Sequence, residues 1–154
     1  MMCGKRNFGD DWVGIDSQHY PHVTSGDVYL EVWPDESADL IYCSHGIAYF
    51  DRDEIVPLLK AWFRVLKPAG KLQISTPDWD VLRTISTPLI GPIYGKMNKP
   101  PIYHKTVYNY HELYSVLRKA GFIDIRRTEV YYNDQCLAEY DGKLISLNIE
   151  CRKQ

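Results

Sequence analysis

Residues 37–80, SADLIYCSHGIAYFDRDEIVPLLKAWFRVLKPAGKLQISTPDWD, carry the strongest fold signal in the sequence. Its apolar spacing and its helix-breaking residues predict a strand over Ala38–His45 and a helix near Asp53–Leu66. A turn over Leu66–Gly70 and a second strand over Lys71–Thr76 follow. A strand, a crossover helix and a second strand make one unit of a parallel sheet, so this stretch predicts an α/β protein.

Polar residues stand where the predicted strands end. Ser44 and His45 close the first strand of the unit, Asp16 closes a short apolar run before it, and Asp27 follows a second β-prone segment and Gly26. Ligands of parallel sheets bind outside the carboxyl ends of the strands, where a carboxylate can accept hydrogen bonds from ribose hydroxyls. The carboxylate of Asp27 can accept a hydrogen bond from an exocyclic amine such as that of adenine. The pair favours a nucleoside-bearing cofactor, although both acids also suit helix caps or surface loops.

The remainder of the chain continues the α/β pattern. The predicted elements are a short helix over Trp79–Ser86, a loop over Thr87–Thr106, a helix that Asn109 caps and Gly121 stops, and two strands over Phe122–Val130 and Lys143–Cys151 joined by a hairpin-like excursion. No repeat or second domain is recognisable. Residues 1–154 are therefore predicted to form a single domain with a Rossmann-like parallel sheet and a C-terminal antiparallel hairpin.

Composition and charge narrow the choice of partners. The chain has 154 residues, of which 45% are hydrophobic and 25% charged, and its formal net charge is −2. These values are typical of one soluble domain and give no electrostatic reason to expect nucleic acid or an anionic membrane. No apolar run is long enough to cross a bilayer, and no signal peptide is recognisable. The four cysteines form no CxxC pair, which favours reduced thiols in the cytoplasm and no metal site.

Several segments, taken in order, resemble one family. They are Cys3-Gly4, Trp12–Asp16, Gly26-Asp27, Ser37–His45, Arg64–Gly70, Leu72–Asp78, Tyr103–Lys105 and Leu117–Phe122. Together they resemble the class I S-adenosylmethionine-dependent methyltransferases, in particular the short methyltransferase-domain group. The likeness covers nearly the whole chain, and its most specific part is DLIYCSH followed by RVLKPAGKLQIS, within residues 39–75.

The resemblance implies a cofactor, S-adenosylmethionine or its demethylated product S-adenosylhomocysteine. The residues that it implies for cofactor binding are Cys3, Gly4, Asp16, Ser17, Gly26, Asp27, Val28, Ser44 and His45. Among them Asp16 would hold the ribose diol, and Asp27 with Val28 would face the adenine. Ser44 and His45 would border the sulfonium and the incoming substrate. The cofactor carries the reactivity, so no catalytic triad and no metal cluster is expected.

Two departures from the family pattern bear on activity. Family members begin with an apolar strand that ends in Gly-x-Gly, whereas Met2 stands where the first of these glycines is expected. The sequence thus predicts a first central strand that is missing or vestigial, as in an amino-terminally truncated gene product. Relatives also often carry Leu-Glu-His after the fourth strand, where this chain has Ile47-Ala48-Tyr49.

Two histidines are the candidates for catalysis. His45 follows a strand and can act as a general base or contact the cofactor, and it can equally be a satisfied histidine at a strand end. His104, in the predicted loop Thr87–Thr106, can close over a site as base or orienter, or can simply anchor its loop.

Three functions remain open at this point. The first is methyl transfer to an oxygen, nitrogen or carbon of a small molecule. The second is a non-catalytic methyltransferase-like module that acts through protein contacts, for example as a homodimer. The third, a nicotinamide-dependent oxidoreductase, is disfavoured because the chain has neither a GxGxxG nor a GxxxxGK[ST] motif to hold a pyrophosphate.

Overall fold

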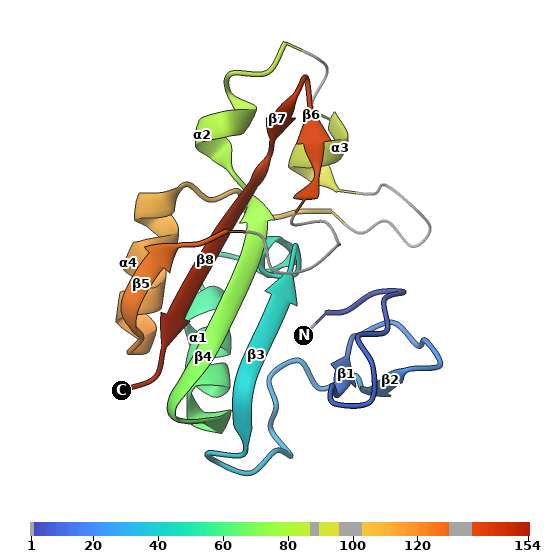
Figure 1. The fold of residues 1–154 in the computed structure, drawn as a ribbon, viewed down its shortest axis with the longest axis vertical. Helices are drawn as coiled ribbons and strands as arrows, with labels where there is room; N and C mark the ends of the chain where they lie inside the picture. Colours follow the sequence, from blue (N-terminus) through green and yellow to red (C-terminus); the bar gives the residue numbers. More distant parts are fainter. Residues whose placement is uncertain (1, 87–89, 96–102, 130–136) are drawn as a thin grey trace.

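A computed structural model of the chain describes residues 2–86, 90–95, 103–129 and 137–154 (Figure 1). Its elements, in order, are β1 (Gly14–Ile15), β2 (Val23–Ser25), β3 (Ala38–Ser44), the 3₁₀ helix η1 (Ile47–Tyr49), α1 (Ile55–Val65), β4 (Leu66–Pro77), α2 (Trp79–Leu82), α3 (Ile90–Tyr94), α4 (Tyr110–Ala120), β5 (Ile123–Arg127), β6 (Glu139–Tyr140), β7 (Lys143–Leu144) and β8 (Ser146–Arg152). The prediction of a mixed α/β fold with a parallel unit is confirmed.

The main sheet has four strands in the order β3-β4-β8-β5. β3 and β4 are parallel, as the β-helix-β unit predicts, and β8 is antiparallel to both β4 and β5. The two predicted C-terminal strands are therefore present as an antiparallel pair, and the excursion between them contains the short β6–β7 hairpin. β1 and β2 form a separate parallel pair that lies beside β3 (Figure 1).

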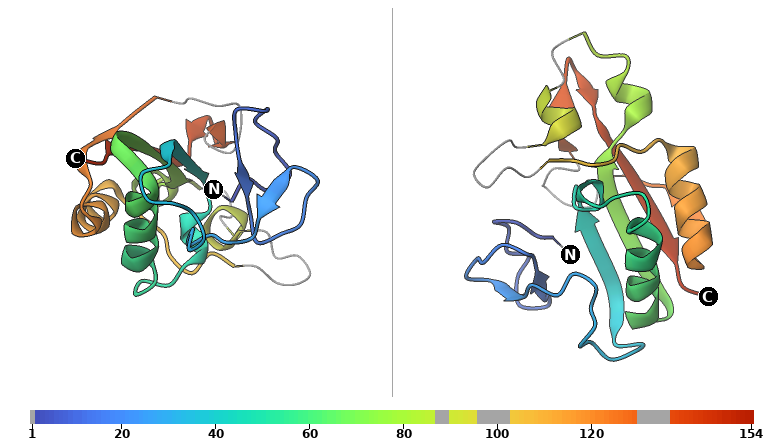
Figure 2. Two further views of the ribbon diagram at one scale, coloured as in Figure 1. Left: turned by 90° about the horizontal axis from the view of Figure 1, so that it is seen from below. Right: turned by 180° about the vertical axis from the view of Figure 1, so that it is seen from behind.

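The hydrophobic core lies between the main sheet and two helices. Figure 2 shows α1 and α4 side by side on one face of the sheet. The buried residues of this layer include Ile41, Cys43, Leu58, Leu59, Trp62, Leu72, Ile74, Leu117, Ile149 and Cys151. On α1 the buried side chains recur three and four residues apart, so the helical periodicity of the sequence does define the packed face.

The predicted turn over residues 66–70 differs from the structure. Leu66 already pairs with Ala38 of β3, so the chain re-enters the sheet directly after α1 and these residues form an irregular start of β4. Ala69 has a φ of 61°. A Cβ added at Gly70 would lie 2.8 Å from the carbonyl oxygen of Lys67, which is closer than real contacts allow. Strand pairing therefore extends through the local turn signal, and the glycine is needed for the close approach.

The segment 79–121 is partly as predicted. α2 is present, and Asp78 caps it by accepting a hydrogen bond from the amide of Asp80. The prediction of a structureless loop over Thr87–Thr106 is wrong at residues 90–94, which form α3; residues 87–89 and 96–102 lie outside the described residues. Asn109 and Glu112 form the predicted reciprocal cap at the start of α4, and Gly121 ends that helix with a φ of 107°.

The two sheets meet at the amino-terminal segment. The carbonyl oxygen of Ile15 in β1 accepts from the amide of Met2 at 2.6 Å and from that of Cys3 at 3.4 Å. Among the described residues no strand pairs with the outer edge of β3. Met2 and Cys3 thus lie beside β1 without forming a strand that joins it to β3.

None of the helices in the described part of the chain is long and apolar enough to span a membrane.

Candidate functional site

Asp16 is the best-anchored acid at the strand ends. Its carboxylate accepts from the amide of Gly4 at 2.7 Å through Oδ2 and from the amide of Gln18 at 2.8 Å through Oδ1. Its own amide donates to the carbonyl oxygen of Ser25 in β2 at 3.1 Å. The residue is 8% exposed, and a carboxylate buried to this degree requires such donors. Asp16 therefore joins the amino-terminal loop to the ends of β1 and β2.

Asp27 follows β2 by two residues and is half-buried. Its amide donates to Oγ of Ser25 at 3.0 Å, and its Oδ2 accepts from the amide of Val32 at 3.2 Å. A Cβ added at Gly26 would lie 3.7 Å from the carbonyl oxygen of Asp16. The segments that follow β1 and β2 thus lie close together at the carboxyl edge of this parallel pair.

The amino-terminal loop presents open backbone at Gly4. This glycine has a φ of 57°, and a Cβ added to it would meet nothing within 4 Å. Its carbonyl oxygen is 3.0 Å from Nε2 of His22, a second link to the β1–β2 pair. Burial raises the pKa of the neighbouring Cys3 thiol, which disfavours a thiolate there.

A small hollow opens between β1 and β3 beside this loop. Its walls come from the amino-terminal segment, β1 and β3. They are formed by Cys3, Arg6, Asn7, Phe8, Trp12, Val13, Gly14, His22 and Tyr42. The side chain of Met2 lies to one side, packed so closely against Gly46 that its Sδ is 2.7 Å from the position of a Cβ on that glycine.

Ser44 and His45 lie at the carboxyl end of β3, as predicted. His45 is buried and has a φ of 55°, a conformation that non-glycine residues adopt infrequently. Its amide donates to the carbonyl oxygen of Ser75 at 2.7 Å, and its Nε2 lies 2.9 Å from Oγ of Ser146 in β8. The hydroxyl oxygen of Ser44 is buried and has no hydrogen-bond partner among the described residues. Such an orphaned group is a candidate for a ligand contact.

His104 belongs to a different part of the site. Its ring packs edge-on against Tyr49 with 4.7 Å between ring centres, and its Nδ1 is 3.2 Å from the carbonyl oxygen of Ile93. Burial lowers the pKa of His104, so the imidazole is neutral near pH 7. Burial, and secondarily the charge of Asp16, raises the pKa of Tyr49. Tyr49, at the end of η1, is thus the described residue whose ring contacts that of His104.

Three residues of the site could not be found from sequence alone. Ser146 approaches His45 from 101 positions away. Trp62, a buried residue of α1, donates its indole N–H to the carbonyl oxygen of Val28 at 2.8 Å. Arg64 contacts the same segment further along. No local pattern encodes such pairings, because each depends on how distant elements pack.

Comparison with known proteins gives one partial match to a family model and one shared fold. Residues 10–74 match the family model of a methyltransferase domain. No curated protein matches the sequence.

Several solved structures share the fold at low identity. The methyltransferase SibL in its apo form is 18% identical with a TM-score of 0.57, over 86% of this chain and 36% of its own. Human N-acetylserotonin methyltransferase in complex with S-adenosylmethionine is 18% identical with a TM-score of 0.58, over 88% and 35%. An S-adenosylmethionine-dependent methyltransferase from Archaeoglobus fulgidus is 17% identical with a TM-score of 0.62, over 92% and 75%. This chain thus spans about a third of the first two proteins.

The TM-scores of 0.57, 0.58 and 0.62 show that these structures share the fold described above. Together with the methyltransferase-domain model that residues 10–74 match, this shared fold makes the chain similar to the class I S-adenosylmethionine-dependent methyltransferases.

Proposed function

We propose that the chain binds S-adenosylmethionine or S-adenosylhomocysteine at the edge formed by Asp16 and Asp27. The observation that carries the proposal is the buried Asp16 carboxylate, held by the amides of Gly4 and Gln18 at the end of β1. In this proposal Asp16 accepts from the ribose diol, and Asp27 with Val28 faces the adenine. The human N-acetylserotonin methyltransferase of similar fold was solved with S-adenosylmethionine and PigF with S-adenosylhomocysteine, which supports the same cofactor here.

The residues present fit the nucleoside half of this cofactor. Two carboxyl groups follow adjacent parallel strands, and open space lies over Gly4. The methionine half has less room, because the Met2 side chain packs against Gly46 just beyond His45. Ser17, next to Asp16, is exposed and can contact the ribose side.

In the proposed reaction the bound cofactor supplies an activated methyl group. The chain's own residues bind and orient the two reactants and exclude water, which is the main protein contribution to an in-line displacement. His45 and His104 are the proposed catalytic residues. The neutral His104 ring can accept a proton from the acceptor, and His45 is oriented by Ser146 at the carboxyl end of β3.

The proposed acceptor is a small molecule methylated on oxygen, nitrogen or carbon. The net charge of −2 offers no attraction for nucleic acid. Cys3, Cys43 and Cys151 are free thiols, which supports a reducing, cytoplasmic location. We further propose that residues 1–154 act as one domain.

Calorimetric titration with S-adenosylhomocysteine tests the proposal. A folded sample is expected to release or absorb heat with a dissociation constant in the micromolar range, about −8 kcal/mol of binding free energy. Circular dichroism of the same sample confirms that it is folded. A folded protein that gives no heat at high ligand concentration would refute cofactor binding.

A non-catalytic module that acts through protein contacts is the second candidate. The outer edge of β3 has no partner strand among the described residues, and an unpaired edge can accept a strand from another chain. Light scattering over a range of concentrations separates the two candidates. A homodimer that forms without cofactor favours the module, and a strict monomer at all concentrations argues against it.

A further inference from the structure

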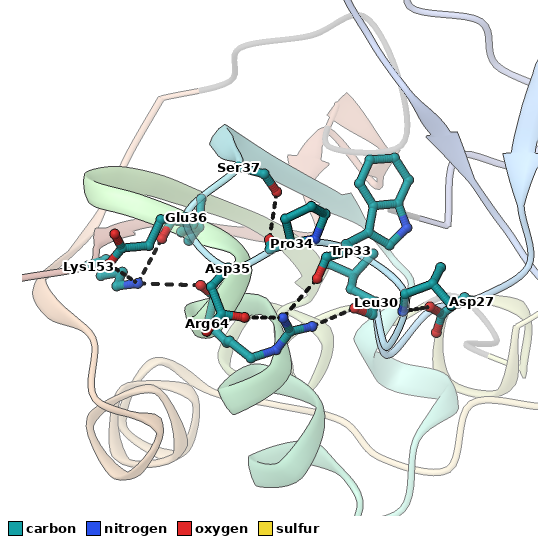
Figure 3. Close-up of polar contacts among 11 residues, drawn as sticks. Asp27, Leu30, Trp33, Pro34, Asp35, Glu36, Ser37, Arg64 and Lys153 are labelled. Atoms are coloured by element: carbon teal, nitrogen blue, oxygen red, sulfur yellow. Dashed lines mark hydrogen bonds and ion pairs between the residues drawn. The ribbon is translucent and has the colours of Figure 1, made fainter.

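The segment between β2 and β3 carries Asp27 and is held from outside by α1. Arg64, in the last turn of α1, donates from its second terminal nitrogen to the carbonyl oxygen of Leu30 at 2.6 Å. Its first terminal nitrogen donates to the carbonyl oxygen of Trp33 at 2.8 Å and pairs with the Asp35 carboxylate (Figure 3). One guanidinium therefore contacts three residues of this segment.

The two carbonyl groups that Arg64 binds lie at the ends of one tight turn. The amide of Trp33 donates to the carbonyl oxygen of Leu30 at 3.1 Å, which closes the turn. Within it, the amide of Val32 donates to Oδ2 of Asp27 at 3.2 Å. The contact from Arg64 thus continues through the turn to one oxygen of the Asp27 carboxylate.

Neighbouring contacts hold Arg64 itself in place. Lys153, whose side chain is 12% exposed, donates to the carbonyl oxygen of Leu66 at 2.8 Å and lies 3.4 Å from the carbonyl oxygen of Arg64. Trp62, two residues before Arg64 on α1, is fully buried and donates a hydrogen bond to the carbonyl oxygen of Val28. A guanidinium can bind several acceptors in a fixed fork, and an ammonium cannot reproduce that geometry.

We propose that Arg64 is a positioning residue that aims the Asp27 carboxylate and so selects a purine with an exocyclic amine. Oδ2 of Asp27 is engaged by Val32, and the described part of the chain shows no hydrogen bond to Oδ1, so Oδ1 can accept a hydrogen bond from the N–H of an amine. Hypoxanthine carries a carbonyl oxygen in place of that amine, and this oxygen cannot donate a hydrogen bond to a carboxylate. This inference rests on the proposed cofactor binding and adds the source of its base selectivity.

The test compares two ligands by calorimetry, S-adenosylhomocysteine and S-inosylhomocysteine, which differ in that one group. The wild type is expected to prefer the adenosyl ligand by about tenfold or more, the value of a lost hydrogen bond to a charged group. Arg64→Met is expected to reduce this ratio to within about twofold of that of Asp27→Asn, and Arg64→Lys to restore only part of it. Lys67→Met is the matched control, because Lys67 pairs with the exposed Asp39 near the same helix end and contacts no turn carbonyl in the described structure.

A second variant tests the same chain of contacts without changing a charge. Val32→Pro removes the amide that Asp27 accepts from, and the Val32 side chain is 82% exposed. Val32→Pro is expected to lower the preference for the adenosyl ligand as Arg64→Met does. It serves as the test of the proposal if Arg64→Met does not fold. A variant that weakens both ligands by one factor, or leaves the ratio unchanged, overturns the proposal, as does a wild type that binds both ligands equally. A folded wild type that binds neither ligand refutes the proposed function instead.

Discussion

The amide of Gly4 donates a hydrogen bond to Oδ2 of Asp16 over 2.7 Å, twelve residues along the chain. This bond closes the amino-terminal loop onto the end of β1. The carboxylate is thereby fixed before any ligand arrives. A group that needs no reorganisation on binding loses less entropy when the ligand binds.

Asp16→Asn is expected to lower the affinity for S-adenosylhomocysteine by about tenfold or more, the value of a hydrogen bond to a charged acceptor. Asparagine has one acceptor oxygen, whereas Gly4 and Gln18 both present N–H groups, so one donor would face the side-chain amide. Calorimetry measures the affinity. Asp39→Asn removes a charge from an exposed acid and is expected to bind normally. Undiminished binding by Asp16→Asn would exclude Asp16 as a cofactor ligand.

Met2→Gly is expected to strengthen cofactor binding by about threefold or more, because it removes a side chain that occupies space in the methionine half of the proposed site. Met2 has a φ of 51°, and its side chain fills the space against Gly46. Glycine removes both the strain and the side chain from the methionine half of the proposed site. Met2→Leu keeps the bulk and is expected to bind as the wild type does. Weaker binding by Met2→Gly than by the wild type would show that Met2 supports the site.

Arg127→Met is expected to lower the free energy of unfolding by about 2 kcal/mol, because it leaves a buried carboxylate without its counter-charge. The side chain of Asp78 is 2% exposed, and its Oδ2 lies 3.0 Å from Arg127. Arg152→Met, which breaks an ion pair with the exposed Asp124, is the matched control and is expected to cost well under 1 kcal/mol. Urea denaturation measures both variants. Equal losses in the two variants would show that burial of Asp78 adds nothing to the pair.

Sequence signals predicted the elements whose causes are local. The cap formed by Asn109 and Glu112 and the buried face of α1 follow from residues within a few positions of one another. The turn signal of Pro68 and Gly70 was local too, yet pairing of Leu66 with Ala38 overrode it. Pairing between strands that are distant in the sequence determines where such a strand begins, and local residue propensities do not predict it.

The candidate site likewise contains some residues that the sequence predicts and others that it does not. Strand-end position placed Asp16 and Asp27 at one edge, because the carboxyl ends of parallel strands coincide. The contact between Arg64 and Leu30 spans 34 positions. It requires α1 and the β2–β3 segment to be packed already, and so no spacing in the sequence indicates it.

His104 is expected to make stability depend on pH. Burial lowers its pKa below the usual value of about 6.5, so between that lowered pKa and about 6.5 the unfolded chain binds more protons than the folded one. The free energy of unfolding should therefore fall as the pH drops from about 7.5 to about 5.5. His104→Gln should show a smaller fall in urea denaturation at the two pH values, whereas His111→Gln, at an exposed position in the first turn of α4, should keep the wild-type fall. An equal fall in His104→Gln and the wild type would contradict burial of the imidazole against Tyr49, and with it the neutral ring that proton acceptance at this site requires.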